Sequence, residues 1–298
     1  MAAAAIEITG LVKTFGKHRA VDGLDLEVPQ GSIFGFLGRN GAGKTTTIKI
    51  LMNMLKPTAG AVEVLGQAPH IHEKELKERV GYISDNPVLY DWMKVEEVAW
   101  FAGQLYPRWD QQKVAALIEH FGLDPKQKIK HLSRGMNAQL NLALVLGHDP
   151  ELLILDEPAS GLDVIVRRDV LESIIQVISA EGRTVFFSSH LVHEVERVAD
   201  QVAIIDQGKL LVCGELDMVR QQVKRVLVRA EDAVDFAGVA GLRGVQGEGR
   251  QRLLTVFDYG DEAKAQIEQA GGQVVEIIDL SLEESFVEHV TPQGGLPS

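Results

Sequence analysis

A glycine-rich segment, GRNGAGKTT at positions 38–46, carries the residue types needed to hold the phosphates of a nucleotide. Gly38, Gly41 and Gly43 let the backbone turn with its N–H groups facing inward, where they can donate hydrogen bonds to phosphate oxygens. Lys44 can reach the terminal phosphates, and the hydroxyl of Thr45 follows at the position suited to Mg²⁺. The segment predicts a nucleoside triphosphate site with magnesium, the alternative being a glycine-rich turn that binds nothing. The residues expected to contact the nucleotide are Gly38, Arg39, Asn40, Gly41, Ala42, Gly43, Lys44, Thr45 and Thr46.

Two adjacent carboxylates end the segment LLILDE at residues 152–157. Because ligands bind at the carboxyl ends of strands in an α/β sheet, an apolar strand over 152–155 would deliver both acids to that edge. Asp156 suits the coordination shell of Mg²⁺, and Glu157 is placed to polarise the water that attacks the terminal phosphate. The alternative for such a pair is a solvated turn.

Short apolar segments rich in β-branched residues predict the strands that position these groups, as is typical of a parallel sheet covered on both faces. A helix over 46–55, ended by Pro57, would place the phosphates at its N-terminus, where unpaired N–H groups and the helix dipole favour anions. Between residues 95 and 147 the pattern changes to helices alone, which predicts a helical subdomain inserted into an α/β core. The strands are expected at 33–37, 80–84, 152–155, 184–188 and 202–205, and the inserted helices at 95–105, 111–121 and 134–146.

The composition of the chain argues against several classes of protein. The chain has 298 residues and 45% hydrophobic content, enough for one large or two modest domains. No stretch reaches the about 18 apolar residues of a membrane span, and the MAAAA start lacks the regions of a signal peptide, so a cytoplasmic protein is expected. The net charge of −12 argues against nucleic acid as a partner. The single cysteine, Cys213, lies in an apolar segment and is predicted to be a buried structural thiol.

The character of the chain changes near residue 221, after which 7 Lys and Arg residues stand against 13 Asp and Glu residues. We place a domain boundary there, between an α/β domain at 1–220 and a small α+β domain at 221–298. Ser281 and Glu284 are spaced as a capping box at the start of a final helix. The order of elements fits a split βαβ sandwich, for which we expect a role in dimerisation or regulation. The elements before that helix are strand 224–229, helix 232–240, strands 242–246 and 252–257, helix 261–270 and strand 273–279.

Three further motifs resemble those of the ATP-binding cassette (ABC) ATPases. The segment HLSRGMNAQL at 131–140 is similar to the signature sequence of that family and contains Ser133 and Gly135. Residues 158–163, PASGLD, resemble the loop that crosses between nucleotide sites and end in Asp163. His190 matches the family's switch histidine. The resemblance covers residues 6 to about 220.

Two less sharp features extend the resemblance. Phe15, just before Gly16, matches the aromatic residue on which the adenine ring stacks. The sequence LSLEESFVEHV, at 280–290, is similar to the end of the short C-terminal domain in ABC exporters of bacterial type. The expected fold is therefore a P-loop NTPase of ABC type with an inserted helical subdomain, followed by a small α+β domain.

The resemblance implies a mechanism that one chain cannot complete. ATP held by one subunit would be covered by Ser133 and Gly135 of a second, head to tail, and closure of this dimer would be the power stroke. Hydrolysis by Glu157, with His190 contacting the γ-phosphate, would reopen it. The partners implied are a second nucleotide-binding subunit, in a homodimer or a heterodimer, and separate transmembrane permease subunits. The chain would then lie on the inner face of the cell membrane.

One residue departs from the family pattern at a position that is expected to lie near the γ-phosphate. Asp85 follows the strand at 80–84, where the family usually has glutamine. A carboxylate there can bind Mg²⁺ or water through oxygen, but it adds a negative charge near the γ-phosphate and donates no hydrogen bond when ionised. We expect Asp85 to act as a catalytic and metal-binding residue and ATP turnover to survive. Arg134, Met136 and Val164 also replace common family residues, without touching Ser133 or Gly135.

Other classes of function stay open. A soluble ABC protein of translation or DNA repair is one alternative, although such proteins generally carry two cassettes, long coiled coils or zinc inserts. A GTP-binding switch is another, but the chain lacks an NKxD-type guanine reader. The segment after Asp85 contains Tyr90, Trp92 and Met93, and in the family this stretch contacts a coupling helix of the membrane partner. Exposed apolar groups often mark interfaces.

Overall fold

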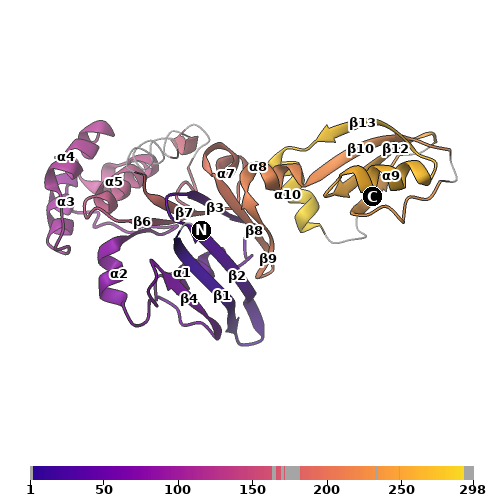
Figure 1. Ribbon diagram of the computed structural model, residues 1–298. Helices are drawn as coiled ribbons and strands as arrows, with labels where there is room; N and C mark the ends of the chain where they lie inside the picture. The colour runs from indigo at the N-terminus through magenta and orange to yellow at the C-terminus, as the bar shows by residue number, and fades with distance from the viewer. Residues whose placement is uncertain are drawn as a thin grey trace. The chain divides into compact units, whose positions relative to one another are not determined.

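A computed structural model describes residues 3–162, 166–168, 171, 182–231, 234–247 and 249–291. The chain divides into two compact units, Met1–Leu210 and Leu211–Ser298 (Figure 1). No helix in the described ranges combines the length and the apolar composition that crossing a bilayer requires. The predicted Asp163 and Val164 lie outside the described residues.

The centre of the first unit is a sheet in the order β5-β6-β7-β3-β8-β9, and the pairs from β5 to β8 are parallel. Every residue of β6 and β7 is buried, as a parallel sheet covered on both faces requires. The predicted α/β core is confirmed. The strands are β3 (Ile33–Gly38), β5 (Val80–Ile83), β6 (Leu152–Asp156), β7 (Thr184–Ser189), β8 (Gln201–Asp206) and β9 (Lys209–Glu215).

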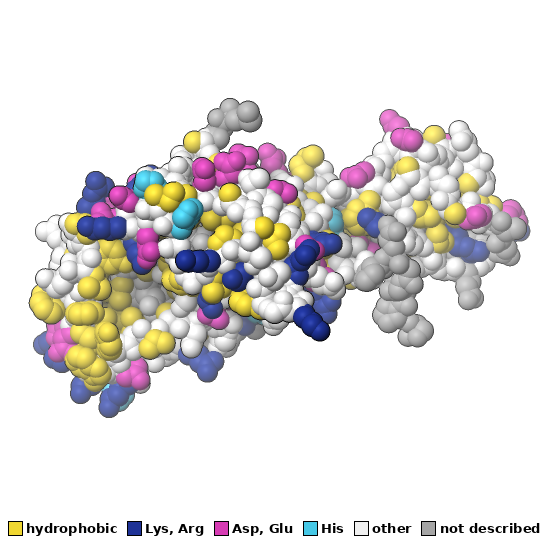
Figure 2. All heavy atoms as spheres, turned by 90° about the horizontal axis from the view of Figure 1, so that it is seen from below, with side chains coloured by type: hydrophobic (Ala, Val, Ile, Leu, Met, Phe, Trp, Pro, Cys, Tyr) yellow, Lys and Arg dark blue, Asp and Glu magenta, His cyan; other side chains and the backbone are white. Residues whose placement is uncertain are grey.

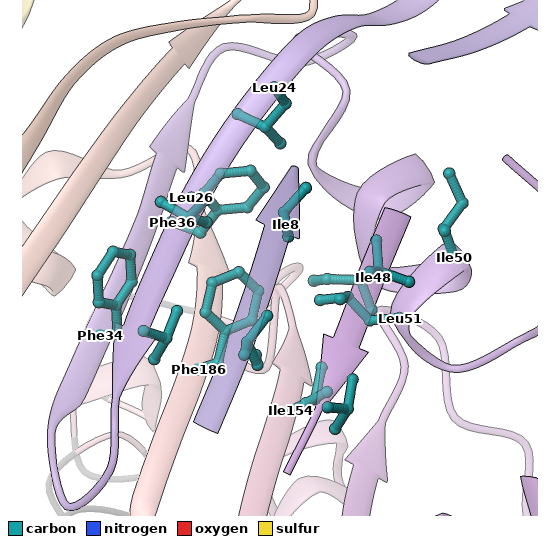
Figure 3. Close-up of a cluster of buried hydrophobic side chains, with 14 of the residues drawn as sticks. Ile8, Leu24, Leu26, Phe34, Phe36, Ile48, Ile50, Leu51, Ile154 and Phe186 are labelled. Carbon is teal, nitrogen blue, oxygen red and sulfur yellow. The ribbon is translucent and has the colours of Figure 1, made fainter. Parts of the chain in front are cut away.

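An antiparallel sheet in the order β2-β1-β4 packs against this core. Its strands are β1 (Ala4–Phe15), β2 (His18–Pro29) and β4 (Ala59–Val64). Figure 3 shows side chains of both sheets and of helix α1 (Lys44–Leu51) meeting in one buried cluster. At its centre the ring of Phe186 lies 5.8 Å from that of Phe34 and 5.2 Å from that of Phe36. This packing fixes β3 against β7, and so fixes the segments that follow them.

Helix α1 differs from its prediction at both ends. It begins at Lys44, two residues before the expected Thr46, and ends at Leu51 rather than Leu55. Asn53 adopts a positive φ of 55°, which a continuing α-helix does not allow. The earlier start brings Lys44 into the first helical turn.

The predicted helical insertion is present as α3 (Val95–Gly103), α4 (Gln111–His120) and α5 (Arg134–Leu146), which contact one another. Asp110 caps α4, its carboxylate accepting from the N–H groups of Gln112 and Lys113 at 2.9 Å. Just after α5, the ring of buried His148 stacks on that of Tyr106, with the ring centres 4.2 Å apart. The remaining elements of the unit are α2 (Glu73–Arg79), a 3-10 turn at Ile129–His131 and α7 (Val192–Val198).

The second unit contains an antiparallel sheet in the order β11-β12-β10-β13. The third of these strands along the chain, β12, separates the first two, as a split βαβ arrangement requires. The capping box of Ser281 and Glu284 is confirmed at the start of α10. The elements are α8 (Leu216–Gln221), β10 (Val223–Arg229), β11 (Leu242–Gln246), β12 (Gln251–Phe257), α9 (Asp261–Gln269), β13 (Gln273–Asp279) and α10 (Leu282–Val290).

Two expectations for this part of the chain are wrong. The helix predicted over 232–240 does not form across its described residues, 234–240, which are irregular as far as 236 and then make turns. There the carboxylate of Asp235 accepts from the N–H of Ala237 at 2.9 Å, a local bond that competes with helix formation. Cys213 is exposed rather than buried, because it lies on an outward-facing position of β9, the last strand of its sheet.

Candidate nucleotide-binding site

The glycine-rich segment forms the turn between β3 and α1. Gly41 and Gly43 have φ values of 82° and 109°, which L side chains rarely adopt. A Cβ at Gly43 would lie 2.5 Å from the carbonyl oxygen of Ala20, and one at Gly38 would lie 2.5 Å from that of Ile205. The turn is therefore possible only with glycine at these positions. Gly43 is the N-cap of α1, so the free N–H groups of the first helical turn are available to an anion.

A cleft of 580 Å³ opens over this turn. Eleven residues predicted from the sequence line it, contributed by β1, the glycine-rich turn, α1 and the segments that follow β5, β6 and β7. The size suits a nucleotide. The eleven are Phe15, Asn40, Gly41, Ala42, Gly43, Lys44, Thr45, Thr46, Asp85, Glu157 and His190.

Three predicted residues meet in the cleft through one carboxylate. Glu157 Oε1 lies 3.1 Å from Lys44 Nζ, and Glu157 Oε2 lies 2.7 Å from His190 Nδ1. Lys44 is 5% exposed and also donates to the carbonyl oxygens of Gly38, at 2.7 Å, and Arg39, at 3.3 Å. Gly38 and Arg39 thus orient the lysine instead of lining the cleft. Glu157 itself has a φ of 50°, a strained value of the kind found at functional sites.

Beneath this group lies Asp156, which is fully buried. Its Oδ1 accepts from Ser188 Oγ at 2.7 Å and from Thr45 Oγ1 at 3.1 Å, while its Oδ2 has no hydrogen-bond partner among the residues that the structure describes. Burial raises the pKa of Asp156, whereas these two hydrogen bonds lower it. The negative charges of Asp85 and Glu157 raise it further.

The unpartnered Oδ2 beside the Thr45 hydroxyl fits a hard cation such as Mg²⁺, which prefers oxygen ligands. Among the residues the structure describes, no cluster of three His, Cys, Asp or Glu side chains could hold a metal alone. Mg²⁺ in nucleotide sites is typically held by one or two carboxylates together with substrate phosphates, and this donor set matches that pattern.

Asp85 lies just past the end of β5, exposed on the wall of the cleft. It influences the chemistry of its surroundings through charge. Burial raises the pKa of Tyr82 to about 12, and the negative charges of Asp156 and Asp85 contribute in the same direction. The charges of both carboxylates therefore affect the same side chain, Tyr82, near the end of β5.

Four contributors to the site were not predicted from the sequence, and one of them is Ala20 of β2, which lines the cleft. Ser188 at the end of β7 donates to Asp156 and accepts from the N–H of Glu157 at 3.0 Å, so one hydroxyl orients both acids. His18 lines the cleft beside Phe15, with which it pairs across the β1–β2 hairpin. A tight turn between Phe15 and His18 was the feature of the sequence that could have predicted His18 beside the cleft. Ser160, in the loop after β6, also lines the cleft.

The predicted signature residues lie elsewhere. Ser133 caps α5, accepting from the N–H of Met136 at 3.2 Å. Gly135 is buried, and a Cβ there would lie 2.3 Å from Val166 Cγ1. Neither residue lines the cleft. Between them, Arg134 donates through Nη1 to the carbonyl oxygen of Gly161 at 3.0 Å, which links α5 to the loop after β6.

At the rim of the cleft, Phe15 is 48% exposed. Lys13 Nζ lies 5.0 Å from the centre of its ring. An exposed aromatic face is available there for stacking with a base.

Known proteins of one family are similar to this chain in sequence and in fold. A family model described as "ABC transporter" matches residues 21–160. The chain is 37% identical over 224 residues to the bacitracin transport ATP-binding protein BcrA of Bacillus licheniformis, covering 74% of this chain and 73% of that protein. It is 33% identical over 214 residues to the linearmycin resistance ATP-binding protein LnrL of Bacillus subtilis, covering 70% and 68%. A solved structure described as the ATP binding subunit of an ABC transporter superposes with a TM-score of 0.66 at 27% identity, covering 73% of this chain and 92% of that one.

Proposed function

The chain belongs to the ATP-binding proteins of ABC transporters, and from that premise we propose that it hydrolyses ATP to ADP and phosphate in order to drive a transporter, in the direction of export. The observation that carries this proposal is the carboxylate of Glu157 held between Lys44 and His190 in a cleft built over a glycine-rich anion site. The similarity to a protein named for linearmycin resistance supports export.

The residues of the cleft divide the chemistry among them. The first turn of α1 and Lys44 bind the phosphates, and Thr45 with Asp156 would hold Mg²⁺. Mg²⁺ would neutralise charge that develops on the phosphate oxygens. Glu157 accepts a proton from the attacking water once nucleotide has drawn Lys44 and His190 away from it. Phe15 stacks on the base, and His190 and Asp85 face the γ-phosphate.

The test is nucleotide titration and phosphate release with the purified chain. We expect ATP binding and turnover in the wild type, loss of binding in Lys44→Ala, and retained binding without turnover in Glu157→Gln. Wild-type protein that binds no adenine nucleotide would refute the proposal. Undiminished affinity in Lys44→Ala would count against the glycine-rich segment as the phosphate site.

A second chain completes the proposed site. Ser133 and Gly135 lie outside the cleft of their own chain, which suits residues that cover a nucleotide held by another chain. We expect Glu157→Gln to form a dimer with ATP in analytical ultracentrifugation and Ser133→Arg to prevent it. A dimer from this chain alone would establish a homodimer, and a dimer only after adding a second ATP-binding subunit would establish a heterodimer.

We assign the membrane partner to the helical end of the first unit. Val88 and Trp92 are 87% and 68% exposed, and Tyr90 lies between them in sequence, with its ring 5.9 Å from that of Trp92. Figure 2 shows hydrophobic side chains gathered on the part of the first unit that carries α3 and α4. This surface would dock on separate permease subunits and hold the chain at the inner face of the membrane.

Co-purification from membranes tests that docking. Trp92→Glu should release the chain from the membrane fraction while leaving the ATP affinity of the purified chain unchanged. Recovery of the wild type with ribosomes or DNA instead would favour the soluble alternative.

The C-terminal unit serves dimerisation or regulation in this proposal. It buries its own core around Val226, Leu254 and Ile267. Removal of residues 221–298 should shift the dimer equilibrium or the ATP turnover rate. Unchanged values of both would end the idea.

A further inference from the structure

Glu194, in helix α7, is a buried carboxylate to which the proposed mechanism gives no role. Its side chain is 5% exposed, and it does not line the nucleotide cleft. A charged group loses its hydration when it is buried, and that loss is tolerated only where partners compensate for it. The partners of Glu194 therefore indicate what the buried charge does.

One partner is the hydroxyl of Ser189, which is fully buried at the end of β7. Ser189 Oγ donates to Glu194 Oε2 and accepts from the N–H of Leu191 at 3.0 Å. Because a hydroxyl has a single proton, donation to Glu194 leaves its lone pairs for that N–H group. The residue enclosed between Ser189 and Leu191 is His190, whose Nδ1 lies 2.7 Å from Glu157 Oε2. Glu194 thus stabilises the backbone on both sides of the histidine.

The other partner is the guanidinium group of Arg167. Its Nε lies 3.5 Å from Glu194 Oε1, and its Nη2 donates to the carbonyl oxygen of Leu162 at 2.8 Å. Leu162 belongs to the loop that follows β6 and Glu157. Through Arg167, Glu194 therefore also contacts the loop that begins beside the second carboxylate of the cleft.

We propose that Glu194 is a positioning residue for ATP hydrolysis. It holds His190 through Ser189, and it holds the loop after Glu157 through Arg167. Both of the segments that it joins carry a residue of the cleft, and Glu194 reaches neither residue directly. The inference rests on the proposed function, because it concerns the same reaction.

Steady-state ATP turnover and equilibrium titration with ADP test this assignment on the full chain. Glu194→Ala should lower kcat by about ten- to a hundredfold, the usual effect of a small misplacement of reacting groups. KM and the affinity for ADP should stay near the wild-type values, because the phosphates are bound by Lys44 and the first turn of α1. Glu194→Gln should recover part of the lost kcat, since its amide oxygen can still accept from Ser189.

A second variant tests the route through the hydroxyl. Ser189→Ala should lower kcat by a factor similar to that of Glu194→Ala. The double variant should fall little further, because two changes that act through one contact are not additive. A wild-type kcat in Glu194→Ala would overturn the inference, and so would losses that multiply in the double variant.

Thr184→Ala is the matched control for stability. Thr184 is buried at the opposite end of β7, where its Oγ1 accepts from the N–H of Gly31 at 2.9 Å. This variant should lose stability in chemical denaturation and keep the wild-type kcat. An equal fall in kcat in Thr184→Ala and Glu194→Ala would also overturn the inference, because loss of any buried hydrogen bond would then suffice.

If Glu194→Ala does not fold, Glu194→Gln and Ser189→Ala provide the same comparison. The two variants should then show a reduced kcat with an unchanged affinity for ADP, and wild-type kinetics in both would overturn the inference. Wild-type protein that hydrolyses no ATP would instead refute the proposed function.

Discussion

The ammonium group of Lys44 and the carboxylate of Glu157 lie 3.1 Å apart, so the residue expected to bind phosphate is paired with the residue expected to activate water. Glu157 also holds His190 through its second oxygen, at 2.7 Å. A nucleotide must therefore replace these contacts in order to bind. In the proposed mechanism, nucleotide binding would thus release Glu157 to act as the catalytic base.

Glu157→Gln should lower ATP turnover by roughly 10²- to 10⁴-fold, the usual contribution of a general base. It should also tighten ADP binding, because Lys44 loses a charged competitor for the β-phosphate. AMP, which presents no β-phosphate to Lys44, should bind both proteins equally. Phosphate release and nucleotide titration measure the three effects, and unchanged turnover would remove Glu157 from its role.

Gly43→Ala should abolish phosphate binding, because its Cβ would lie 2.5 Å from the backbone oxygen of Ala20. Relieving that clash displaces the N-terminus of α1. Gly66 provides the control, since its φ of 72° is also positive but its Cβ would meet open space. Gly66→Ala should lose some stability through backbone strain and keep its ATP affinity. Equal affinities for ATP in the two variants would contradict the clash.

Ser188→Ala should lower kcat by about tenfold with little change in KM, since Ser188 positions Asp156 and Glu157 without lining the cleft. The loss of a buried hydrogen-bond partner should also cost about 1–3 kcal/mol of stability. Ser160→Ala, in the cleft wall, serves as the comparison. Kinetics and chemical denaturation separate the two effects, and a change in KM alone would argue against positioning.

Stability should fall in acid because of His148. Burial lowers the pKa of this imidazole to about 4 from its ordinary 6.5, with the charge of Arg183 acting in the same direction and the backbone of Val80 and the charge of Asp149 opposing it. Below pH 6.5 the unfolded chain takes up a proton that the folded chain resists until about pH 4. The free energy of unfolding should therefore decrease across that window by up to about 3 kcal/mol.

Denaturation of His148→Gln at several pH values checks this assignment. The variant should lose less stability than the wild type between pH 6.5 and 4. His70→Gln, at an exposed histidine, should follow the wild type. An unaltered pH profile in His148→Gln would show that other groups carry the acid sensitivity.

Much of the site was predictable because its chemistry lies in contiguous motifs. The glycine-rich turn needs its residues in one stretch, and Asp156 and Glu157 must follow a buried strand, so local sequence carries both. Ser188 was missed because a serine at the end of a strand has no distinctive spacing. Its role depends on β7 lying beside β6, which is a property of the sheet.

The errors have the same origin. Cys213 lies in an apolar segment, but whether that segment is covered depends on its place at the end of the sheet order. In the segment predicted as helix 232–240, the hydrogen bond that the Asp235 carboxylate accepts from the N–H of Ala237 competes with a weak helical pattern. The intrinsic preference of a segment for helix or strand determines its structure only where tertiary contacts or local side-chain hydrogen bonds do not oppose it.

The hydrogen bond from Arg134 to the carbonyl of Gly161 ties the start of one helix to a loop far along the chain. If α5 rotates and this hydrogen bond is kept, the loop that begins just after Glu157 must move with the helix. A movement of this loop on nucleotide binding would thus be transmitted through one hydrogen bond to α5, and from α5 to a second chain that contacts it.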